Sequence, residues 1–284
     1  ANDLPTARAI LVGDPELARS EPQLVYRLAQ VDFRAGEYAR ADAALSDLLD
    51  EPTTRNDALF AARVHNARGA VHIREDDYAG AKSDYDAAIA LLGNSGHASE
   101  RGLALTGRGA VDAMRHDFAD ALADLGQARV QLEEAGDALA IARVDSNLGG
   151  LEMDRDRPEQ ALPYLKSSAT TFEAYGAINE LMETLASLVS DNLALLRPAD
   201  ALGASDRSWI LAPRVTDPNQ RLNLDLARVD VFLALGRQRE AAALLGGLPD
   251  DATESNAFVA RRLHVLRARL ALAQGRDAVA ATEA

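Results

Sequence analysis

The apolar residues of this chain recur at helical intervals in short segments, and polar or glycine-containing turns separate these segments. Such spacing places the apolar residues on one face of an α-helix, so the pattern predicts helices rather than strands. Turn signals such as Ala35-Gly36 and Gly246-Gly247 end successive segments. The predicted helices cover roughly residues 6–12, 23–35, 38–50, 57–74, 78–92, 99–115, 118–135, 138–154, 158–175, 179–195, 198–211, 218–235, 239–245, 255–274 and 276–282.

Small residues recur every 40 residues at two positions of this pattern. Alanine fills one position six times and glycine fills the other three times: Ala41, Ala81, Ala121, Ala161, Ala201 and Ala241, and Gly69, Gly109 and Gly149. A fixed period of this size is the signature of a solenoid of stacked repeats. Glycine inside a helix costs about 1 kcal/mol relative to alanine, so its recurrence indicates that two helix backbones approach closely. Each repeat therefore reads as two antiparallel helices joined by a tight turn.

These residues resemble the tetratricopeptide repeat. The resemblance is strongest in residues 67–88, where the family's small and aromatic positions are filled by Gly69, Tyr78, Ala81, Tyr85 and Ala88. It extends over roughly residues 20–284. The fifth repeat departs from the family pattern at three positions, which hold Val189, Pro198 and Ser205 instead of the expected glycine, aromatic and bulky residues.

The repeat of this chain is longer than the family's usual repeat. With its Gly136-Asp137 and Asn147-Leu148-Gly149, it looks like the repeat of bacterial signal-responsive transcription regulators. It is also similar to that of cell-polarity adaptors, which bind extended peptides. The resemblance implies an all-α fold, a right-handed superhelical α-solenoid of stacked antiparallel helix pairs. We expect residues 1–20 to form a partial repeat or N-terminal cap, and residues 21–284 to form a single solenoid of about seven units, the last truncated or capping.

The composition of the chain narrows the classes of function. Its net charge of −14 argues against direct binding of nucleic acid, because a duplex-binding surface carries a basic stripe. The absence of cysteine excludes disulfides, thiolate metal sites and cysteine nucleophiles. No run approaches ~18 consecutive apolar residues, so we expect no transmembrane helix. The cellular location stays open, with the cytoplasm slightly favoured over the periplasm.

The residue types used in catalysis do not form a recognisable motif. No two of the five histidines stand at the i, i+4 spacing of a helical zinc site. Gly107-Arg108-Gly109 lies inside a predicted helix, so it indicates close packing rather than a phosphate loop. We expect Arg108 to pair with Asp112 one turn later. We expect most other carboxylates to lie on solvated helix faces, among them Asp145, Glu152, Asp154 and Asp156. The sequence therefore predicts no enzyme, no cofactor and no metal site.

The family resemblance implies that the first helix of each repeat lines a concave groove. Four small residues at equivalent positions would form a shallow floor that admits a helix or an extended chain. Hydrogen-bonding side chains stand beside this floor. The predicted binding residues are Tyr26, Gln30, Arg63, Asn66, Ala70, Ala110, Arg143, Ser146, Asn147, Gly150, Ser190 and Asp230. The alternative is that Asn147 only caps or bridges neighbouring helices and that the other positions are solvated surface.

Two functions follow from this architecture. The first is a non-catalytic scaffold that binds a protein or peptide in the groove. The second is the sensory or regulatory module of a larger signalling protein, such as a bacterial transcription regulator. Because the chain begins at Ala1 and stops inside a predicted helix, we expect a longer polypeptide with an effector domain that is missing here.

Two local features of the sequence stand outside the repeat pattern. A run of arginines makes the last repeat locally basic: Arg261, Arg262, Arg267, Arg269 and Arg276. Such a run is either a solvated face or a docking site for an acidic partner or a neighbouring domain. The only tryptophan, Trp209, falls in the irregular fifth repeat, where we expect it to plug a joint between helices.

Overall fold

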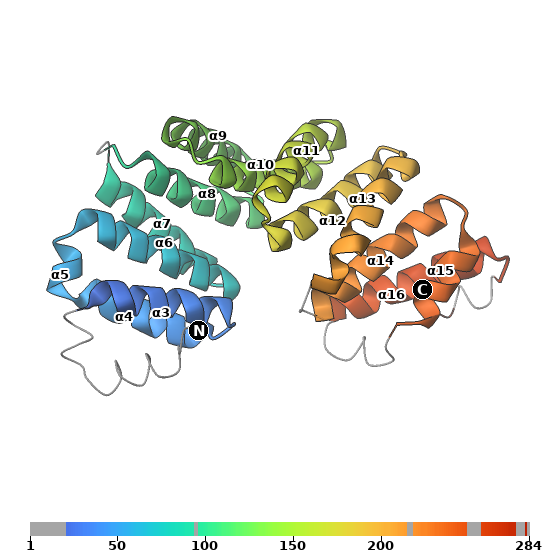
Figure 1. Cartoon of the computed structure of the whole chain (residues 1–284), viewed down its shortest axis with the longest axis horizontal. Coiled ribbons are helices and arrows are strands. Elements are labelled where there is room, and N and C mark those ends of the chain that lie inside the picture. Colours follow the sequence, from blue (N-terminus) through green and yellow to red (C-terminus); the bar gives the residue numbers. More distant parts are fainter. Residues whose placement is uncertain (1–20, 94–95, 215–217, 249–256, 277–281, 283–284) are drawn as a thin grey trace. The chain divides into compact units, whose positions relative to one another are not determined.

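The computed structural model describes residues 21–93, 96–214, 218–248, 257–276 and 282. These residues form helices and turns and contain no strand, which confirms the all-α prediction (Figure 1). The first half of the chain contains α3 (Pro22–Arg34), α4 (Tyr38–Asp50), α5 (Pro52–Arg55), α6 (Ala58–Arg74), α7 (Tyr78–Leu92), α8 (Ala98–Met114) and α9 (Phe118–Ala135). The second half contains α10 (Ala138–Asp154), α11 (Pro158–Tyr175), α12 (Ile178–Ala194), α13 (Pro198–Leu211), the 3-10 helix η1 (Ala212–Arg214), α14 (Pro218–Ala234), α15 (Gln238–Gly246) and α16 (Ala257–Ala273).

The predicted helix boundaries agree closely with these elements. The sequence pattern missed α5, because Glu51-Pro52 reads as a turn. Proline is favoured at the first position of a helix, however, and Pro52 opens a single helical turn there. The predicted helix 6–12, the cap over residues 1–20 and most of the predicted helix 276–282 lie outside the described residues and stay predictions.

The chain forms two compact units, Ala1–Val144 and Asp145–Ala284, and the boundary falls within α10. Within the first unit, α3 packs on α4, α4 on α6, α6 on α7, α7 on α8 and α8 on α9. Within the second, α11 packs on α12, α12 on α13, α13 on α14, and α16 packs on both α14 and α15. Each unit is therefore built from helix pairs that stack on the next pair, as a repeat protein requires.

The turn from the first to the second helix is the same in successive repeats. One residue in each turn has a positive φ, and these residues are spaced 40 apart: Gly36, Asp76, His116, Asp156, Leu196 and Gly236. The next residue donates its N–H to the carbonyl five residues back, for example from Asp117 to Asp112 at 2.8 Å. This is the Schellman arrangement, which satisfies the last carbonyls of a helix. It fixes the exit direction of every first helix.

The glycines inside the helices mark close contacts between helices. A Cβ added to Gly107 would lie 2.3 Å from the Tyr85 ring, and one added to Gly149 would lie 2.5 Å from Leu165. Both distances are far below a normal contact, so a side chain at either position would displace its neighbour. The Gly107-Arg108-Gly109 segment thus serves close helix packing, as predicted from its place in α8.

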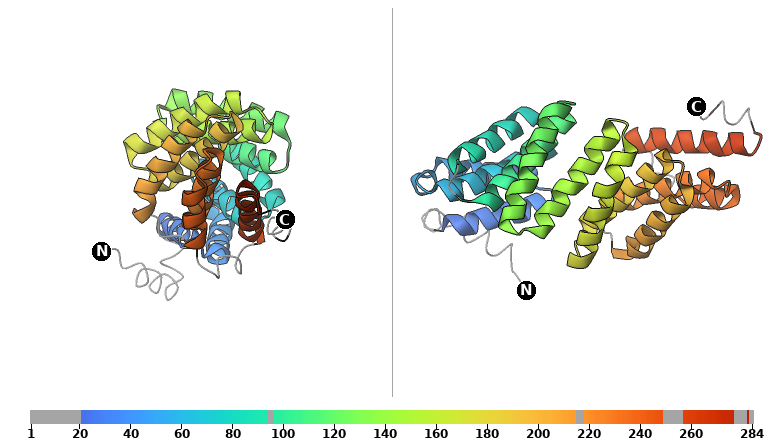
Figure 2. Two further views of the ribbon diagram at one scale, coloured as in Figure 1. Left: turned by 90° about the vertical axis from the view of Figure 1, so that its right-hand side faces the viewer. Right: turned by 90° about the horizontal axis from the view of Figure 1, so that it is seen from above.

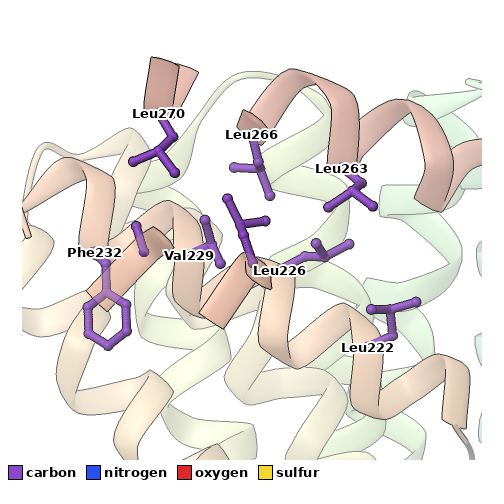
Figure 3. Packing of buried hydrophobic residues seen from close by; sticks show 9 residues of the cluster. Leu222, Leu226, Val229, Phe232, Leu263, Leu266 and Leu270 are labelled. Carbon is purple, nitrogen blue, oxygen red and sulfur yellow. The ribbon is translucent and has the colours of Figure 1, made fainter. Parts of the chain in front are cut away.

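Leucines fill the core between the last helices (Figure 3). Leu222 and Leu226 of α14 face Leu263 and Leu266 of α16, and all four are buried. Leu226 stands 160 residues after Asn66, at the equivalent position of its repeat. The position that is polar in the second repeat is therefore part of the core in the sixth. No helix of the described residues is both long and apolar enough to span a membrane.

Candidate functional site

The first helices of successive repeats lie side by side within each unit. In the first unit α3 contacts α6 and α6 contacts α8, and in the second unit α12 contacts α14 and α14 contacts α16 (Figure 2 gives two further views of these helices). Equivalent residues on these helices therefore form rows that cross from one helix to the next. The predicted binding residues all lie on first helices and are half-buried or exposed.

Small residues form one such row in each unit, and we call these residues together the small-residue row. It contains Ala70 and Ala110 in the first unit and Gly150 and Ser190 in the second. A Cβ added to Gly150 would meet nothing within 4 Å, whereas its neighbour Gly149 packs against Leu165. Gly150 therefore faces open space, and a ligand can approach the backbone of α10 there. The Ser190 hydroxyl donates to the Ala186 carbonyl at 3.3 Å, within its own helix.

Polar side chains flank the small-residue row in the first unit and connect α6 to α8. The Arg63 Nε donates to the Glu100 carboxylate at 3.1 Å, and the Asn66 amide donates to the Glu100 carbonyl oxygen at 3.2 Å. Burial alone would raise the pKa of Glu100, but the hydrogen bond and charge of Arg63 hold it below its usual value. The Asn66 Oδ1 is buried and accepts no hydrogen bond within the described residues.

Tyr26 and Gln30 occupy the same face of α3. The Tyr26 ring meets the Phe60 ring edge-on, with 5.7 Å between centroids. Burial raises the pKa of the Tyr26 hydroxyl, while the Arg63 charge and a hydrogen bond with Gln30 act in the opposite direction. The two aromatic rings therefore help to join α3 to α6, and the polar ends of Tyr26 and Gln30 contact one another.

In the second unit the polar residues differ in their exposure and in their hydrogen-bond partners. Ser146 and Thr184 share a hydrogen bond of 3.2 Å between their hydroxyls, which connects α10 to α12. Asn147 is half-buried on α10, and Arg143 is exposed one turn earlier on that helix. Asp230 of α14 accepts hydrogen bonds from two arginines of α16, from Arg262 at 3.2 Å and from Arg269. Its carboxylate is thus committed to an ion-pair network.

A second row, which we call the apolar row, follows the small-residue row on its C-terminal side. It contains Phe33, Ile73 and Ala113 in the first unit and Met153, Leu193 and Leu233 in the second, and all six are half-buried. The family resemblance also assigns these six residues to the groove lining, in addition to the predicted binding residues. The structure keeps an apolar residue at this position in every described repeat of this type.

Two arginines on first helices, Arg68 and Arg108, each join two neighbouring second helices, so their charges are used within the fold. Arg108 donates to Asp124 at 2.6 and 2.7 Å and to Asp86 at 2.6 Å. Arg68 makes the equivalent contacts with Asp84 and Ser46. The predicted pairing of Arg108 with Asp112 is wrong. Asp112 instead accepts from Lys82 of α7, because both lie where α7 packs on α8.

Two carboxylates that we expected on solvated faces are buried. Asp145 accepts a hydrogen bond from the Ser167 hydroxyl at 3.0 Å, and Glu152 accepts one from Arg155 at 2.9 Å. They are seven residues apart on α10, which places both on one face of that helix. Glu152 Oε2 accepts no hydrogen bond from any described residue.

The histidines of α6 contact carboxylates rather than one another. His65 Nδ1 lies 2.7 Å from Asp84 Oδ1, and His72 lies 3.2 Å from both Asp84 and Asp42. Burial alone would raise the pKa of Asp84, but hydrogen bonds from His65 and Arg68 lower it below its usual value. Among the described residues, no group of three or more metal-binding side chains is placed to hold an ion.

Trp209 of α13 lies where this helix meets α14, but it is not fully buried there. Its side chain is 40% exposed on α13, next to Ile210. The guanidinium carbons of Arg221 and Arg228 lie 5.7 and 5.1 Å from its ring centroid, a cation–π geometry. Ser205 and Ser208 on the same helix are buried.

Comparison with solved structures shows tetratricopeptide-repeat proteins among those that resemble this chain. No protein-family model and no curated protein sequence matches it. The apo form of the quorum sensor NprR from B. thuringiensis matches with a TM-score of 0.74 and 12% identity, over 99% of this chain and 80% of that one. A Rap protein complexed with competence and sporulation factor matches with a TM-score of 0.69 and 16% identity, over 92% and 72%.

A tetratricopeptide repeat protein from Parabacteroides merdae ATCC 43184 is similar over 92% of this chain and 90% of its own length, with a TM-score of 0.56 and 17% identity. At such low identities the likeness concerns the fold alone. The chain therefore has the tetratricopeptide-repeat fold, as its sequence predicted.

Proposed function

We propose that this chain is a non-catalytic scaffold that binds a segment of a protein or peptide on the face formed by its first helices. The observation that carries the proposal is the pair of rows on that face. In each unit the small-residue row lies between a polar residue, Asn66 in the first unit and Asn147 in the second, and the apolar row. A bound segment would place its backbone over the small residues, direct apolar side chains to the apolar row and direct amides to the polar residues.

The geometry of Gly150 supports this arrangement. Open space above its Cα allows a ligand backbone to come closer than it could over a larger residue. Ala70 and Ala110 provide a similar low surface in the first unit. The Arg63 and Glu100 contacts hold the adjacent polar side chains in fixed positions, which lowers the entropy that binding would cost.

The second candidate is a sensory or regulatory module of a larger signalling protein. The structural likeness to a quorum sensor and to a Rap protein bound to competence and sporulation factor favours it. This argument is an analogy between folds, and fold alone does not fix function. The two candidates share the same binding face and differ in whether an effector domain responds to the ligand.

An affinity pull-down from a lysate of the source organism, read by mass spectrometry, tests the scaffold. The double variant Arg143→Ala and Asn147→Ala removes two polar side chains from α10 and is expected to lose the partner. Gln127→Ala, at an exposed amide of the second helix α9, serves as the control and should retain it. Far-ultraviolet circular dichroism should be the same for all three proteins. Undiminished capture by the double variant would contradict the proposal.

A further inference from the structure

Helix α16 has a charge opposite to that of the chain as a whole. The sequence carries a net charge of −14, yet α16 contains four arginines, one histidine and no acidic residue. The four arginines are Arg261, Arg262, Arg267 and Arg269. A basic segment in an acidic chain creates a local positive potential that attracts negatively charged groups.

The two sides of α16 have different roles. Leu263, Leu266 and Leu270 are buried in the core shared with α14 and α15 (Figure 3). A different side carries Arg261, Val265, Arg269 and Leu272, whose spacings of four, four and three residues place them in one line along the helix. We call this line the α16 stripe. Val265 is 49% exposed and Leu272 is 58% exposed, although both are large apolar residues.

Among the described residues, the ion pairs between α16 and α14 leave the α16 stripe with a positive excess. Asp230 is the carboxylate of α14 that accepts hydrogen bonds from Arg262 and Arg269. One carboxylate thus faces two guanidinium groups, and its own side chain is only 17% exposed. These contacts also hold the Arg262 and Arg269 side chains in place, so less entropy is lost when they meet a further anion.

We propose that the α16 stripe binds an acidic segment of a partner protein that also carries apolar side chains. Carboxylates of the segment would pair with Arg261 and with the remaining donors of Arg269, and its apolar residues would cover Val265 and Leu272. Arginine suits this role because its planar guanidinium can bind a carboxylate through two hydrogen bonds. Val265 and Leu272 are seven residues apart, which is the anchor spacing of helix-to-helix recognition. The stripe adjoins Asp230, one of the predicted binding residues, but contains no residue of the small-residue row, so the two proposals can fail separately.

Fluorescence anisotropy with a short labelled peptide tests the proposal on the whole chain. The probe contains glutamate and leucine at helical spacing, and a second probe replaces each glutamate with glutamine. We expect the acidic probe to bind, and we expect its affinity to fall as salt is raised, because salt screens exposed charges. The glutamine probe should bind much more weakly.

Matched variants locate the binding. Arg261→Glu with Leu272→Ser should weaken binding of the acidic probe by about tenfold or more, since it reverses a charge and removes an anchor. Arg207→Glu with Ile210→Ser also reverses one charge and removes one exposed apolar side chain, on α13, where Ile210 is 75% exposed and Arg207 pairs with Glu173, and it should leave binding unchanged. Leu272→Ser alone provides a milder variant in case the double variant does not fold.

Three outcomes would overturn the proposal. The α16 variants could bind the acidic probe as well as the unmodified chain does, or the glutamine probe could bind equally well. In the third outcome, analytical ultracentrifugation would reveal self-association that is lost in the α16 variants. That result would show that a second copy of this chain covers the stripe.

Discussion

Asp191 is a buried charge at a position that is apolar in neighbouring repeats. The residues at 40-residue intervals from it are Val71, Val111, Leu151 and Val231. Asp191 is fully buried, and neither of its carboxylate oxygens accepts a hydrogen bond from a described residue. Burial raises the pKa of Asp191 to about 6, Arg197 and Lys166 oppose this shift, and Glu159 adds to it. Ionisation of this carboxyl therefore favours the unfolded chain.

The effect of pH on stability follows from the direction of this shift. The folded chain binds the proton more tightly than the unfolded chain, in which the pKa is near 3.8. Below about pH 4 the carboxyl is protonated in both states, and its contribution to the free energy of unfolding is fully present. As the pH rises from 4 through 6, the unfolded chain releases this proton more readily than the folded chain, so that contribution is lost. The contribution then stays constant at higher pH.

Asp191→Val should stabilise the chain at pH 7 by on the order of 1–3 kcal/mol, because it removes an unsatisfied buried group. Urea unfolding of the variant and the unmodified chain at pH 4, 5, 6 and 7 gives the difference at each pH. We expect the gain to shrink as the pH falls toward 4. A gain that is independent of pH would mean that the pKa of Asp191 is the same in the folded and unfolded chains.

At the scale of single residues, the sequence predicted the close helix contacts at small residues well and the partners of charged side chains poorly. The positions of Gly69, Gly109 and Gly149 follow from the repeat period, and all three lie at close helix contacts. The partners of Arg108 could not be read from the sequence, because they lie on two other helices, 16 and 22 residues away. The i, i+4 rule describes pairs of side chains on one isolated helix. In the folded chain, the carboxylates of neighbouring helices bind Arg108 instead.

At the scale of elements, the second helix of each repeat depends on an alanine near its start. Ala121 of α9 is fully buried, and its carbonyl lies 3.2 Å from the Cβ position that a side chain at Gly109 would require. The two backbones are therefore too close for a larger side chain at this contact. The same alanine recurs in six repeats at 40-residue spacing, which is why the sequence alone identified the helix pairs.

Ala121→Leu should destabilise the chain by on the order of 1–3 kcal/mol through overpacking between α8 and α9. Thermal unfolding followed by circular dichroism measures the change. Ala123→Leu provides the control, since Ala123 is exposed two residues later on the same helix and should have little effect. Identical melting curves for the two variants would show that the assigned repeat register is wrong.

Helix turns were the other feature that the sequence determined well. The turn residue with positive φ is glycine at Gly36 and Gly236, where this conformation costs little. At Leu196 the same conformation is held by a leucine that is 87% exposed. The repeated backbone pattern therefore overrides local preference there. The single-turn helix α5 escaped prediction because four residues are too few to show helical periodicity.

At the scale of the whole molecule, the repeat period predicts the fold and also predicts which residues share a row. The 12 predicted binding residues all lie on first helices, whose places the period predicts, and the family resemblance assigns the groove lining to those helices. The period could not show that Asp230 is engaged by α16 or that Leu226 is buried, because both depend on which side chains face them across helices. The binding role of the rows stays a prediction.

The steric variant Gly150→Leu tests the central claim most directly. Open space surrounds the Cβ position of Gly150 on the first helix α10, and open space also surrounds that of Gly203 on the second helix α13. Leucine at either position should therefore leave the fold intact, and Gly203→Leu is the matched control. Quantitative mass spectrometry of partners retained from a lysate of the source organism compares the two variants with the unmodified chain. We predict that Gly150→Leu loses a partner that Gly203→Leu retains, whereas equal retention by both would contradict binding over the small-residue row.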